Sequence, residues 1–281
     1  MSKSRLWTVV AALALTIGVL FAAGCGSSDS STTSGGTGAS ADLGLKSSGK
    51  LLVGSDIPFP PFEFGNPPAY DGFDVNLVDE IAKRLGLSVT WQDTPFNTIF
   101  VNLDAGQFDM VASASTITPE RQQTVDFSDP YYEAQQALVV VPGSDIKTVQ
   151  DLAGKTVGAQ DGTTGEAYAN DETDASTVQG YPQGPDVINA LKTGQVDAGI
   201  LDQPVAQDAV DKQGGVEIAA VIPTGELYGF AFQKDNDALR EAVNKELKAM
   251  EADGALDKIY QKWFKVNAPK NVVDGTTPPV G

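Results

Sequence analysis

The chain of 281 residues contains no histidine and one cysteine, Cys25. Without histidine it cannot build a Ser-His-Asp triad, a Cys/His nucleophile pair or a histidine zinc site. With one cysteine it cannot form a disulfide within the chain. These absences exclude several common classes of hydrolase and metalloprotein, and the sequence predicts neither a metal nor a cofactor.

Basic residues are scarce. There are 19 Lys and Arg against 37 Asp and Glu, a formal net charge of −18. A protein this acidic is repelled by phosphate backbones, so we expect no nucleic-acid partner. Arg121 is the one cation between Arg84 and Lys147. An isolated cation in an acidic chain favours a role in binding an anionic group of a ligand.

Long apolar runs are also lacking after the N-terminus. The run from Leu6 to Ala23 follows Lys3 and Arg5 and ends in LFAAGC, which resembles a bacterial lipoprotein signal. The resemblance implies a signal peptide over residues 1–24 and lipidation of Cys25, which anchors the protein by lipid chains. The alternative is an uncleaved N-terminal anchor helix.

Residues 25–49 are nearly all Ser, Gly and Thr, and such a segment offers too little apolar surface to fold. We expect a tether there. Folded sequence is expected from KLLVGSD to WFKVN, and residues 266–281 are expected to form a loose tail.

The sequence contains two internal echoes. VNLDAGQFDMVASAS (101–115) matches NALKTGQVDAGILDQ (189–203), and GKLLVGSD (49–56) matches GKTVGAQD (154–161). Each copy of the first echo is typical of a helix stopped by a C-terminal glycine and followed by a short apolar strand, and each copy of the second is typical of a strand ending in an aspartate. The second echo places Asp56 and Asp161 at matching strand ends. Repeated strand–helix–strand units predict two similar α/β lobes.

In open α/β sheets, ligands bind beyond the carboxyl ends of the strands. The residues that follow the echoed strands are therefore candidates for the binding site. They are Asp56, Ser113 to Thr116, Asp161 and Asp202. A helix is predicted at NLVDEIAKRLG, with Leu77, Val78, Ile81 and Leu85 on one face and Gly86 at its end.

Several motifs in order resemble the solute-binding proteins of polar amino-acid ABC transporters. They are GSDIPFPPFEF, GFDVNLVDEIAKRLGL, TITPER with VDFSDPYY, GAQDGTTGEAYA, GQVDAGILD and DGALDKIYQKWF, and the resemblance covers residues 49–265. It implies the type II periplasmic-binding-protein fold, two α/β lobes joined by two crossing strands. We expect crossings in ALVVV (137–141) and LYGFAF (227–232). Lobe 1 is then expected at 50–137 and 229–265, and lobe 2 at 138–228.

The resemblance also implies how the ligand's α-groups are held. Arg121 corresponds to the arginine that holds the α-carboxylate, helped by Thr116 and by the helix start at Thr163 and Thr164. Asp202 corresponds to the aspartate that accepts the α-ammonium, with the carbonyl of Ala114 and the hydroxyl of Thr116. The residues themselves favour a helix capped by Thr118 with Pro119 in its first turn, whose dipole faces the anion. Read alone, Asp202 is an N-cap before Gln203 and Pro204.

The same resemblance places Phe59 and Phe96 on either side of the ligand side chain. Asp56 and Gln160 lie on the same loops, where Asp161 either faces the cleft or caps the next helix. A guanidinium or ammonium suits this set best, so arginine, lysine or ornithine is expected first and glutamine second. We expect core packing from Phe62, Phe64, Phe100 and Phe108, and lobe packing from Tyr131 and Tyr132.

We expect a binding protein and not an enzyme, and an enzyme on the same fold is the less favoured alternative. Dehydratases and peptidoglycan-cleaving lyases resemble the same fold, and Glu63 and Glu133 are the available acids, although nothing in their sequence surroundings marks a raised pKa. A receptor sensor domain would need a further span and a signalling domain. The family implies a monomer at the outer face of the cytoplasmic membrane that delivers its amino acid to permease subunits.

Overall fold

The computed structural model describes residues 42–270 and 272–274 of the chain. The predicted signal peptide (1–24), the predicted lipidation site Cys25 and residues 26–41 of the predicted tether lie outside these ranges. Within the described part of the chain, no helix combines the length and the apolar composition needed to cross a membrane.

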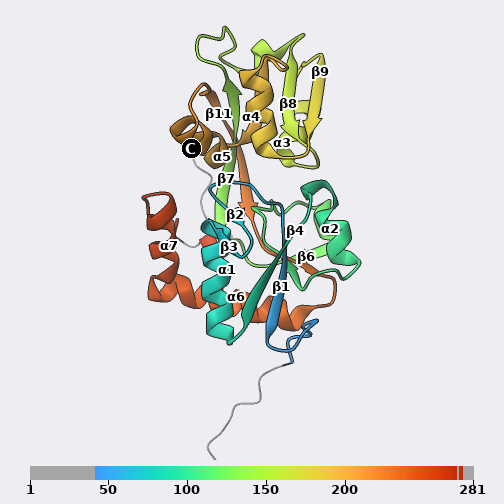
Figure 1. The fold of residues 1–281 in the computed structure, drawn as a ribbon, viewed down its shortest axis with the longest axis vertical. Coiled ribbons are helices and arrows are strands. Elements are labelled where there is room, and N and C mark those ends of the chain that lie inside the picture. Colours follow the sequence, from blue (N-terminus) through green and yellow to red (C-terminus); the bar gives the residue numbers. More distant parts are fainter. Residues whose placement is uncertain (1–41, 271, 275–281) are drawn as a thin grey trace, which may run out of the picture. The chain divides into compact units, whose positions relative to one another are not determined.

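The first lobe is a mixed sheet with helices packed around it (Figure 1). Its strands lie in the order β4 (Ser88–Asp93), β1 (Lys50–Ser55), β5 (Met110–Val111), β12 (Ala231–Gln233) and β6 (Val125–Phe127). β1 is parallel to β4 and β5, whereas β12 is antiparallel to its neighbours. The helices are α1 (Phe73–Leu85), α2 (Phe96–Asp104), α6 (Asp237–Asp253) and α7 (Ala255–Trp263), and a hairpin of β2 (Phe64–Asn66) and β3 (Ala69–Asp71) precedes α1.

The second lobe has the same design. Its strands lie in the order β11 (Glu217–Tyr228), β7 (Tyr132–Val140), β10 (Ala198–Asp202), β8 (Thr156–Gln160) and β9 (Thr177–Tyr181). Its helices are α3 (Thr164–Asp171), α4 (Gly184–Lys192) and α5 (Gln203–Lys212). Short 3-10 turns complete the described chain at η1 (Arg121–Gln123), η2 (Val149–Leu152) and η3 (Val272–Asp274).

Helix α1 forms where its apolar spacing predicts it. Leu77, Val78 and Ile81 are buried on one face, and the helix ends at Gly86 with a φ of 71°. Glycine reaches this left-handed conformation without the steric cost of a Cβ, which is why the helix stops there.

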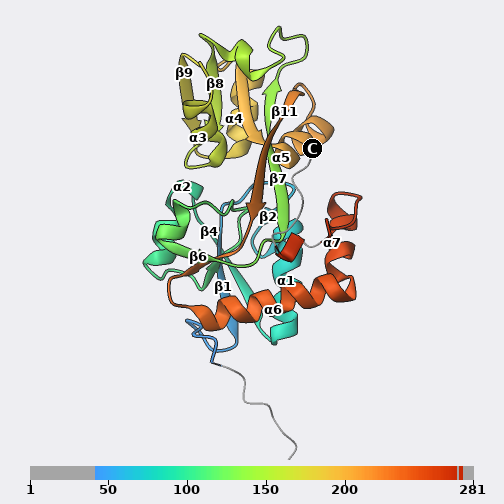
Figure 2. The ribbon, with the colours of Figure 1, turned by 180° about the vertical axis from the view of Figure 1, so that it is seen from behind.

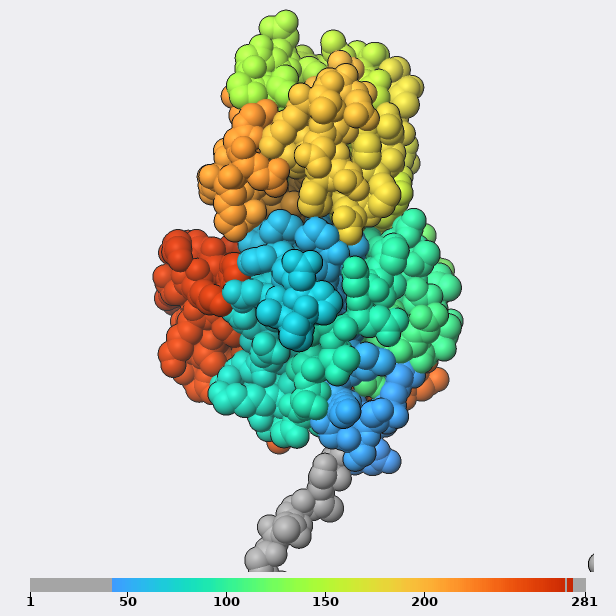
Figure 3. All heavy atoms as spheres, in the orientation of Figure 1, coloured from blue at the N-terminus to red at the C-terminus, as the bar shows by residue number. Residues whose placement is uncertain are grey.

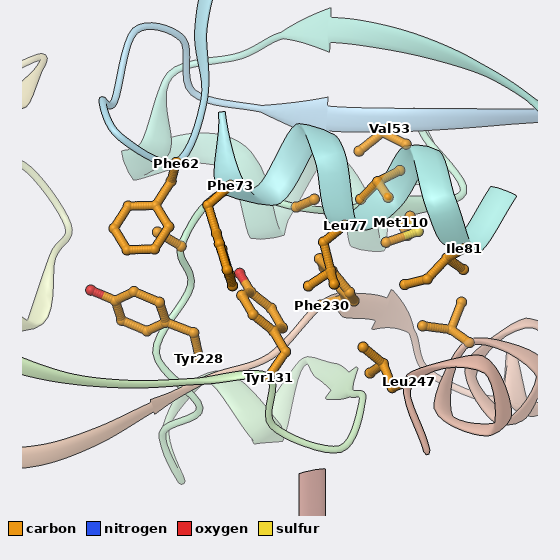
Figure 4. Packing of buried hydrophobic residues seen from close by; sticks show 14 of the residues in the cluster. Val53, Phe62, Phe73, Leu77, Ile81, Met110, Tyr131, Tyr228, Phe230 and Leu247 are labelled. Carbon is orange, nitrogen blue, oxygen red and sulfur yellow. The ribbon is translucent and has the colours of Figure 1, made fainter. Parts of the chain in front are cut away.

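An aromatic core joins α1 to the returning C-terminal segment of the first lobe (Figure 4). The rings of Tyr131 and Phe230 stack at 4.4 Å, and Phe62 and Phe73 meet edge to face at 5.9 Å. Edge-to-face and offset pairs of this kind add to the free energy gained by burial alone. The core role predicted for Phe62 is confirmed, as is the packing role of Tyr131, because both are fully buried.

Strands β7 and β11 belong to the second sheet and extend side by side from it to the first lobe, which Figure 2 shows from behind. They pair antiparallel from Tyr132 opposite Tyr228 to Val140 opposite Glu217. Residues 136–139 also pair with β10, so they are part of the second sheet. The first crossing therefore lies several residues before the predicted 137–141. That apolar run suits the interior of a sheet covered on both faces, which is where it lies.

Matching hydrogen bonds in the two lobes correspond to the echoed Gly-Gln-x-Asp segments. Asp109 accepts from the N–H of Leu52 at 2.8 Å, and its own N–H donates to the Leu52 carbonyl at 2.8 Å. Asp197 makes the same two bonds with Thr156, each at 2.8 Å. Each aspartate thus fixes its segment to a parallel strand of its own lobe, β1 in the first lobe and β8 in the second.

The sheet register corrects one part of the echo. Val53 and Gly54 pair with Met110 and Val111, and residues 157–158 pair with 198–199 in the same way. These pairs make β1 equivalent to β8 and β5 equivalent to β10. Asp56 after β1 therefore corresponds to Gln160 of β8, and Ala114 after β5 corresponds to Asp202 of β10. The sequence match of Asp56 with Asp161 is therefore shifted by one residue. Two residues separate Gly-Lys from Val-Gly in lobe 1 (49–54), whereas one residue separates them in lobe 2 (154–158).

Both ends of the described chain are more ordered than predicted. Leu43 and Leu45 pack on the first lobe's core, and the N–H of Lys46 donates to Asp109 at 2.8 Å. Val272 and Val273 are fully buried in the same core. The tether prediction is therefore wrong for residues 42–49, and the loose-tail prediction is wrong for η3. In each case a pair of apolar residues supplies the surface that the neighbouring polar sequence lacks.

Candidate functional site

One cavity at the carboxyl ends of the strands is lined by the ten residues expected to contact the ligand, whereas the other candidates Ser115 and Asp161 do not line it. Ser113 completes the lining. The set is Asp56, Phe59, Phe96, Ser113, Ala114, Thr116, Arg121, Gln160, Thr163, Thr164 and Asp202. The cavity has a volume of about 10 Å³, room for about one water molecule. In the space-filling view the lobes touch along much of their seam (Figure 3). A larger ligand therefore needs the cavity walls to separate.

The sheets explain why these residues meet. Asp56 follows β1, Gln160 ends β8 and Asp202 ends β10, while residues 113–116 follow β5. β1 and β5 are parallel, as are β8 and β10. Parallel strands place their carboxyl ends at one edge of a sheet, so each lobe presents two strand ends to the cavity.

Arg121 contacts both lobes. Its Nη1 donates to the carbonyl of Thr116 at 2.8 Å, and its Nη2 donates to the carbonyl of Gly162 at 3.1 Å. The guanidinium lies over Phe96 and Phe100, 5.1 and 4.9 Å from the ring centroids. Burial lowers its pKa, and Asp202 and Glu226 oppose that change. A stacked, desolvated guanidinium is well suited to hold a carboxylate through two hydrogen bonds.

The helix expected at Thr118 is only the single turn η1, Arg121–Gln123. The hydroxyl of Thr118 accepts from the N–H of Arg121 at 3.2 Å, so the local hydrogen bond is present. β6 begins at Val125 and leaves space for one turn. The predicted helix dipole at this position is therefore wrong, because one turn does not align enough peptide groups.

Helix α3 begins at the cavity. The hydroxyl of Thr163 accepts from the N–H of Glu166 at 3.1 Å and donates to the carbonyl of Gln160 at 2.8 Å. Thr163 is thus the N-cap, and Thr164 is the first helical residue. The free N–H groups of a first helical turn favour an anion.

Asp56 and Gln160 meet directly across the cavity. The Nε2 of Gln160 donates to Oδ2 of Asp56 at 2.5 Å. Burial raises the pKa of Asp56 to about 7, the Gln160 hydrogen bond opposes this, and Asp93 adds to it. Beside them, the ring of Phe59 is close to Gly184, where a Cβ would be 3.3 Å from the ring. A cation placed here would favour the ionised form of Asp56.

Asp161 does not line this cavity. Its Oδ1 lies so close to Gly180 on β9 that a Cβ there would be 1.9 Å away. The N-cap of α3 is Thr163. Asp161 therefore fills neither of the two roles considered from the sequence.

Asp202 is held by donors from the crossing strands. The hydroxyl of Tyr228 donates to its Oδ2 at 2.6 Å, and the Nε2 of Gln136 donates to its Oδ1. Burial raises the pKa of Asp202 to about 7, Glu226 adds to this, and the two hydrogen bonds and Arg121 oppose it. Asp202 occupies the N-cap position of α5, yet its side chain makes no capping hydrogen bond. Its carboxylate is therefore directed to the crossing strands and the cavity.

Sequence reasoning missed several residues beside the cavity. Glu226 accepts from the hydroxyls of Thr116 and Thr164 at 2.6 and 2.7 Å and from Gln136 at 3.0 Å. Phe100, predicted as core, is only half-buried and lies under Arg121. The sequence offers no clear signal for Gln136 or Glu226, because β7 also carries Glu133 and Gln135 and β11 also carries Glu217 and Thr224.

Glu63, a candidate acid for an enzyme, is fully buried and does not line the cavity. Burial and neighbouring Asp74 raise its pKa well above its usual range, which its sequence surroundings do not indicate. Glu63 accepts from the hydroxyl of Ser113 at 2.9 Å, and Asp74 accepts from the N–H of Ala114 at 2.9 Å. Ala114 has a φ of 42°, so these acids support a strained part of the cavity wall.

Comparison with known proteins gives a consistent family. Residues 51–266 match the family described as "Bacterial extracellular solute-binding proteins, family 3". The arginine-binding extracellular protein ArtP of Bacillus subtilis (strain 168) is 34% identical over 252 residues, covering 85% of this chain and 91% of the relative. The histidine-binding periplasmic protein of Salmonella typhimurium is 34% identical over 229 residues, covering 76% and 87%.

Solved structures are similar over both lobes. An ancestral arginine-binding protein bound to arginine is 42% identical with a TM-score of 0.73, covering 77% of this chain and 98% of that chain. An ancestral arginine-binding protein bound to glutamine is 41% identical with a TM-score of 0.72 and the same coverage. The ancestral amino acid-binding protein AncCDT-1, a precursor of cyclohexadienyl dehydratase, is 37% identical with a TM-score of 0.72. The match covers 77% of this chain and 96% of that chain.

Proposed function

The chain belongs to the bacterial extracellular solute-binding proteins, family 3, and we propose that it binds a polar amino acid between its lobes for delivery to the permease of an ABC transporter. The observation that carries this proposal is the single cavity lined by Arg121, Asp202 and Asp56. One cation and two carboxylates, each held by different neighbours, match the charges of an amino acid with a donor-rich side chain.

The α-groups of the ligand find complementary partners. Arg121 and the first turn of α3 offer donors to the α-carboxylate. Asp202 offers a carboxylate to the α-ammonium, and the carbonyl of Ala114 and the hydroxyl of Thr116 are further acceptors at the cavity wall. Because the partners come from both lobes, the complete grip requires the lobes to be closed.

The side-chain end favours a basic amino acid. Arg121 is the one cation among the lining residues, so a glutamate or aspartate side chain has no partner of its own there. Asp56 is 2% exposed, and a large aliphatic ligand would leave it buried without compensation. A guanidinium or ammonium pairs with Asp56 and gains from the faces of Phe59 and Phe96. We therefore propose arginine, lysine or ornithine, and glutamine second.

The proposal includes the cellular setting. A lipid on Cys25 after removal of residues 1–24 would hold the protein at the outer face of the cytoplasmic membrane. A monomer with one cavity suffices for delivery to permease subunits. Mass spectrometry of the mature protein tests the lipid, because a diacylglyceryl group changes the mass of the N-terminal peptide.

A catalytic function on this fold needs an acid or base that faces the cavity. Glu63 and Glu133 do not line it. The carboxyl groups that do, Asp56 and Asp202, accept hydrogen bonds from Gln160, Gln136 and Tyr228. This arrangement supports binding rather than catalysis.

A thermal-shift screen against the twenty amino acids plus ornithine and citrulline tests the proposal, since a ligand that binds only the folded state raises the melting temperature. We expect the largest shifts from the basic amino acids, followed by glutamine. Competition calorimetry then ranks arginine, glutamine, glutamate and leucine. Tight glutamate or leucine binding would contradict the proposal, and glutamine outcompeting arginine would select the second ligand.

A further inference from the structure

Glu226 lies immediately behind the cavity on crossing strand β11. It is 9% exposed and lines a groove that is separate from the cavity. Thr116 and Thr164 line both the groove and the cavity, so they lie between Glu226 and the cavity. Its Oε2 accepts from the hydroxyl of Thr116 at 2.6 Å and from the hydroxyl of Thr164 at 2.7 Å. The first threonine belongs to one lobe and the second to the other, so one carboxylate oxygen joins both walls.

These contacts fix the direction of two hydroxyl groups. A threonine hydroxyl has one hydrogen and two lone pairs, and a carboxylate can only accept. The hydrogens of Thr116 and Thr164 must therefore point to Glu226. The two hydroxyl oxygens are 3.5 Å apart, longer than the roughly 2.7–2.8 Å typical of a hydroxyl–hydroxyl bond. The Nε2 of Gln136 donates to the Thr164 hydroxyl at 3.4 Å, so Thr164 and Thr116 each keep at least one lone pair that can accept from a ligand.

We propose that Glu226 is a positioning residue that sets the hydrogen-bond polarity of the cavity, by making Thr116 and Thr164 acceptors for the ligand's α-ammonium. This inference rests on the proposed function and deepens it. The two oriented oxygens add to Asp202 as acceptors for the ammonium. The α-carboxylate then takes its hydrogen bonds from Arg121 and backbone N–H groups instead of these hydroxyls.

The test compares ligands that differ in one α-group. Arginine, δ-guanidinovalerate, which lacks the α-ammonium, and agmatine, which lacks the α-carboxylate, are titrated into the parent protein and into Glu226→Gln. The glutamine amide keeps the size of the side chain but can donate, so a threonine hydrogen is freed toward the cavity. The ratio of the dissociation constants of δ-guanidinovalerate and arginine measures what the α-ammonium contributes to binding. We expect this ratio to be about tenfold smaller in Glu226→Gln than in the parent protein. The ratio of the dissociation constants of agmatine and arginine is expected to be equal in the two proteins.

Glu217→Gln is the matched control, because Glu217 is on the same strand but pairs with Lys147 at 3.6 Å on the surface. It should keep the parental ratios. If Glu226→Gln weakens arginine and δ-guanidinovalerate by one common factor, Glu226 has no role in hydroxyl direction and the inference is overturned. Thr164→Val, which removes one of the two oriented hydroxyls, serves if Glu226→Gln does not fold; a common factor there overturns the inference equally.

The proposed function and this inference fail in different ways. A parent protein that binds neither arginine nor glutamine contradicts the proposed function itself. A parent that binds tightly, with ratios unchanged in the variants, contradicts only the role of Glu226. If glutamine is the tighter ligand, glutaramate replaces δ-guanidinovalerate as the compound without the α-ammonium, with the same expected change in ratio.

Discussion

At the scale of a single residue, we expect the carboxyl group of Asp56 to couple ligand binding to pH. Burial in the closed cavity raises its pKa to about 7, so closure without a cationic ligand keeps a proton on it through the range in which an unfolded aspartate is ionised. A guanidinium needs the ionised form, and binding therefore releases that proton. We expect arginine affinity to rise as the pH rises from about 5 to about 7 and then to level off.

Calorimetry in buffers of different ionisation enthalpy measures this proton release. Asp56→Asn removes the group and should leave only the part of the dependence due to Asp202, whose pKa is also about 7. Glutamine, whose side chain is neutral, should show the shallower profile of Asp202 alone. Arginine binding that is independent of pH in the parent protein would contradict the pairing with Asp56.

Arg121 gives the second prediction at this scale. Arg121→Ala removes both the guanidinium and its contacts with the carbonyls of Thr116 and Gly162. We expect a loss of about 2–5 kcal/mol of binding free energy, because the ligand's carboxylate is left unpaired in a closed cavity. Arg240→Ala, whose guanidinium pairs with Asp237 outside the cavity, is the control measured by the same titration. Affinity within threefold of the parent would rule out Arg121 as the carboxylate partner.

At the scale of elements, the two aspartate clamps should differ in strength. Asp109 is 2% exposed and accepts from the N–H groups of Lys46 and Leu52, whereas Asp197 is exposed and accepts from Thr156. Asp109→Ala leaves two partly buried N–H donors without their acceptor, so we expect it to lower the free energy of unfolding by about 1–3 kcal/mol. Asp197→Ala should cost less because water can replace its carboxylate. Urea unfolding of both variants compares them; an equal or larger cost at Asp197 would contradict this account.

The elements also show where sequence reasoning succeeds and where it stops. The glycine stops and apolar runs predicted α1 and the strands near Asp56, Ala114, Gln160 and Asp202, because local patterns determine them. The position of the first crossing could not be read, since residues 137–141 look alike as a link or as a buried strand. The contacts of Glu226 depend on strand pairing between residues 90 positions apart, and no local pattern encodes them.

At the scale of the whole molecule, closure should depend on the ligand. Closed lobes bury Asp56 and partly bury Asp202, and a carboxylate without a cationic partner is costly to bury. Cross-lobe bonds such as Gln160 to Asp56, at 2.5 Å, form only when the lobes meet. We expect arginine to lower the radius of gyration in small-angle scattering. The same titration of Arg121→Ala should leave the profile unchanged, and an unchanged parent profile at saturation would favour a rigid cavity.

The equivalence of Asp56 and Gln160 makes the cavity modular. In the proposed binding mode, one position from each lobe forms the side-chain end, while Arg121 and Asp202, which have other neighbours, hold the α-groups. Paired substitutions at 56 and 160 can therefore retune which amino acid is captured without altering the grip common to all of them. In a fluorescent biosensor built on these lobes, a small combinatorial library at two codons would cover the choice between charged and neutral analytes.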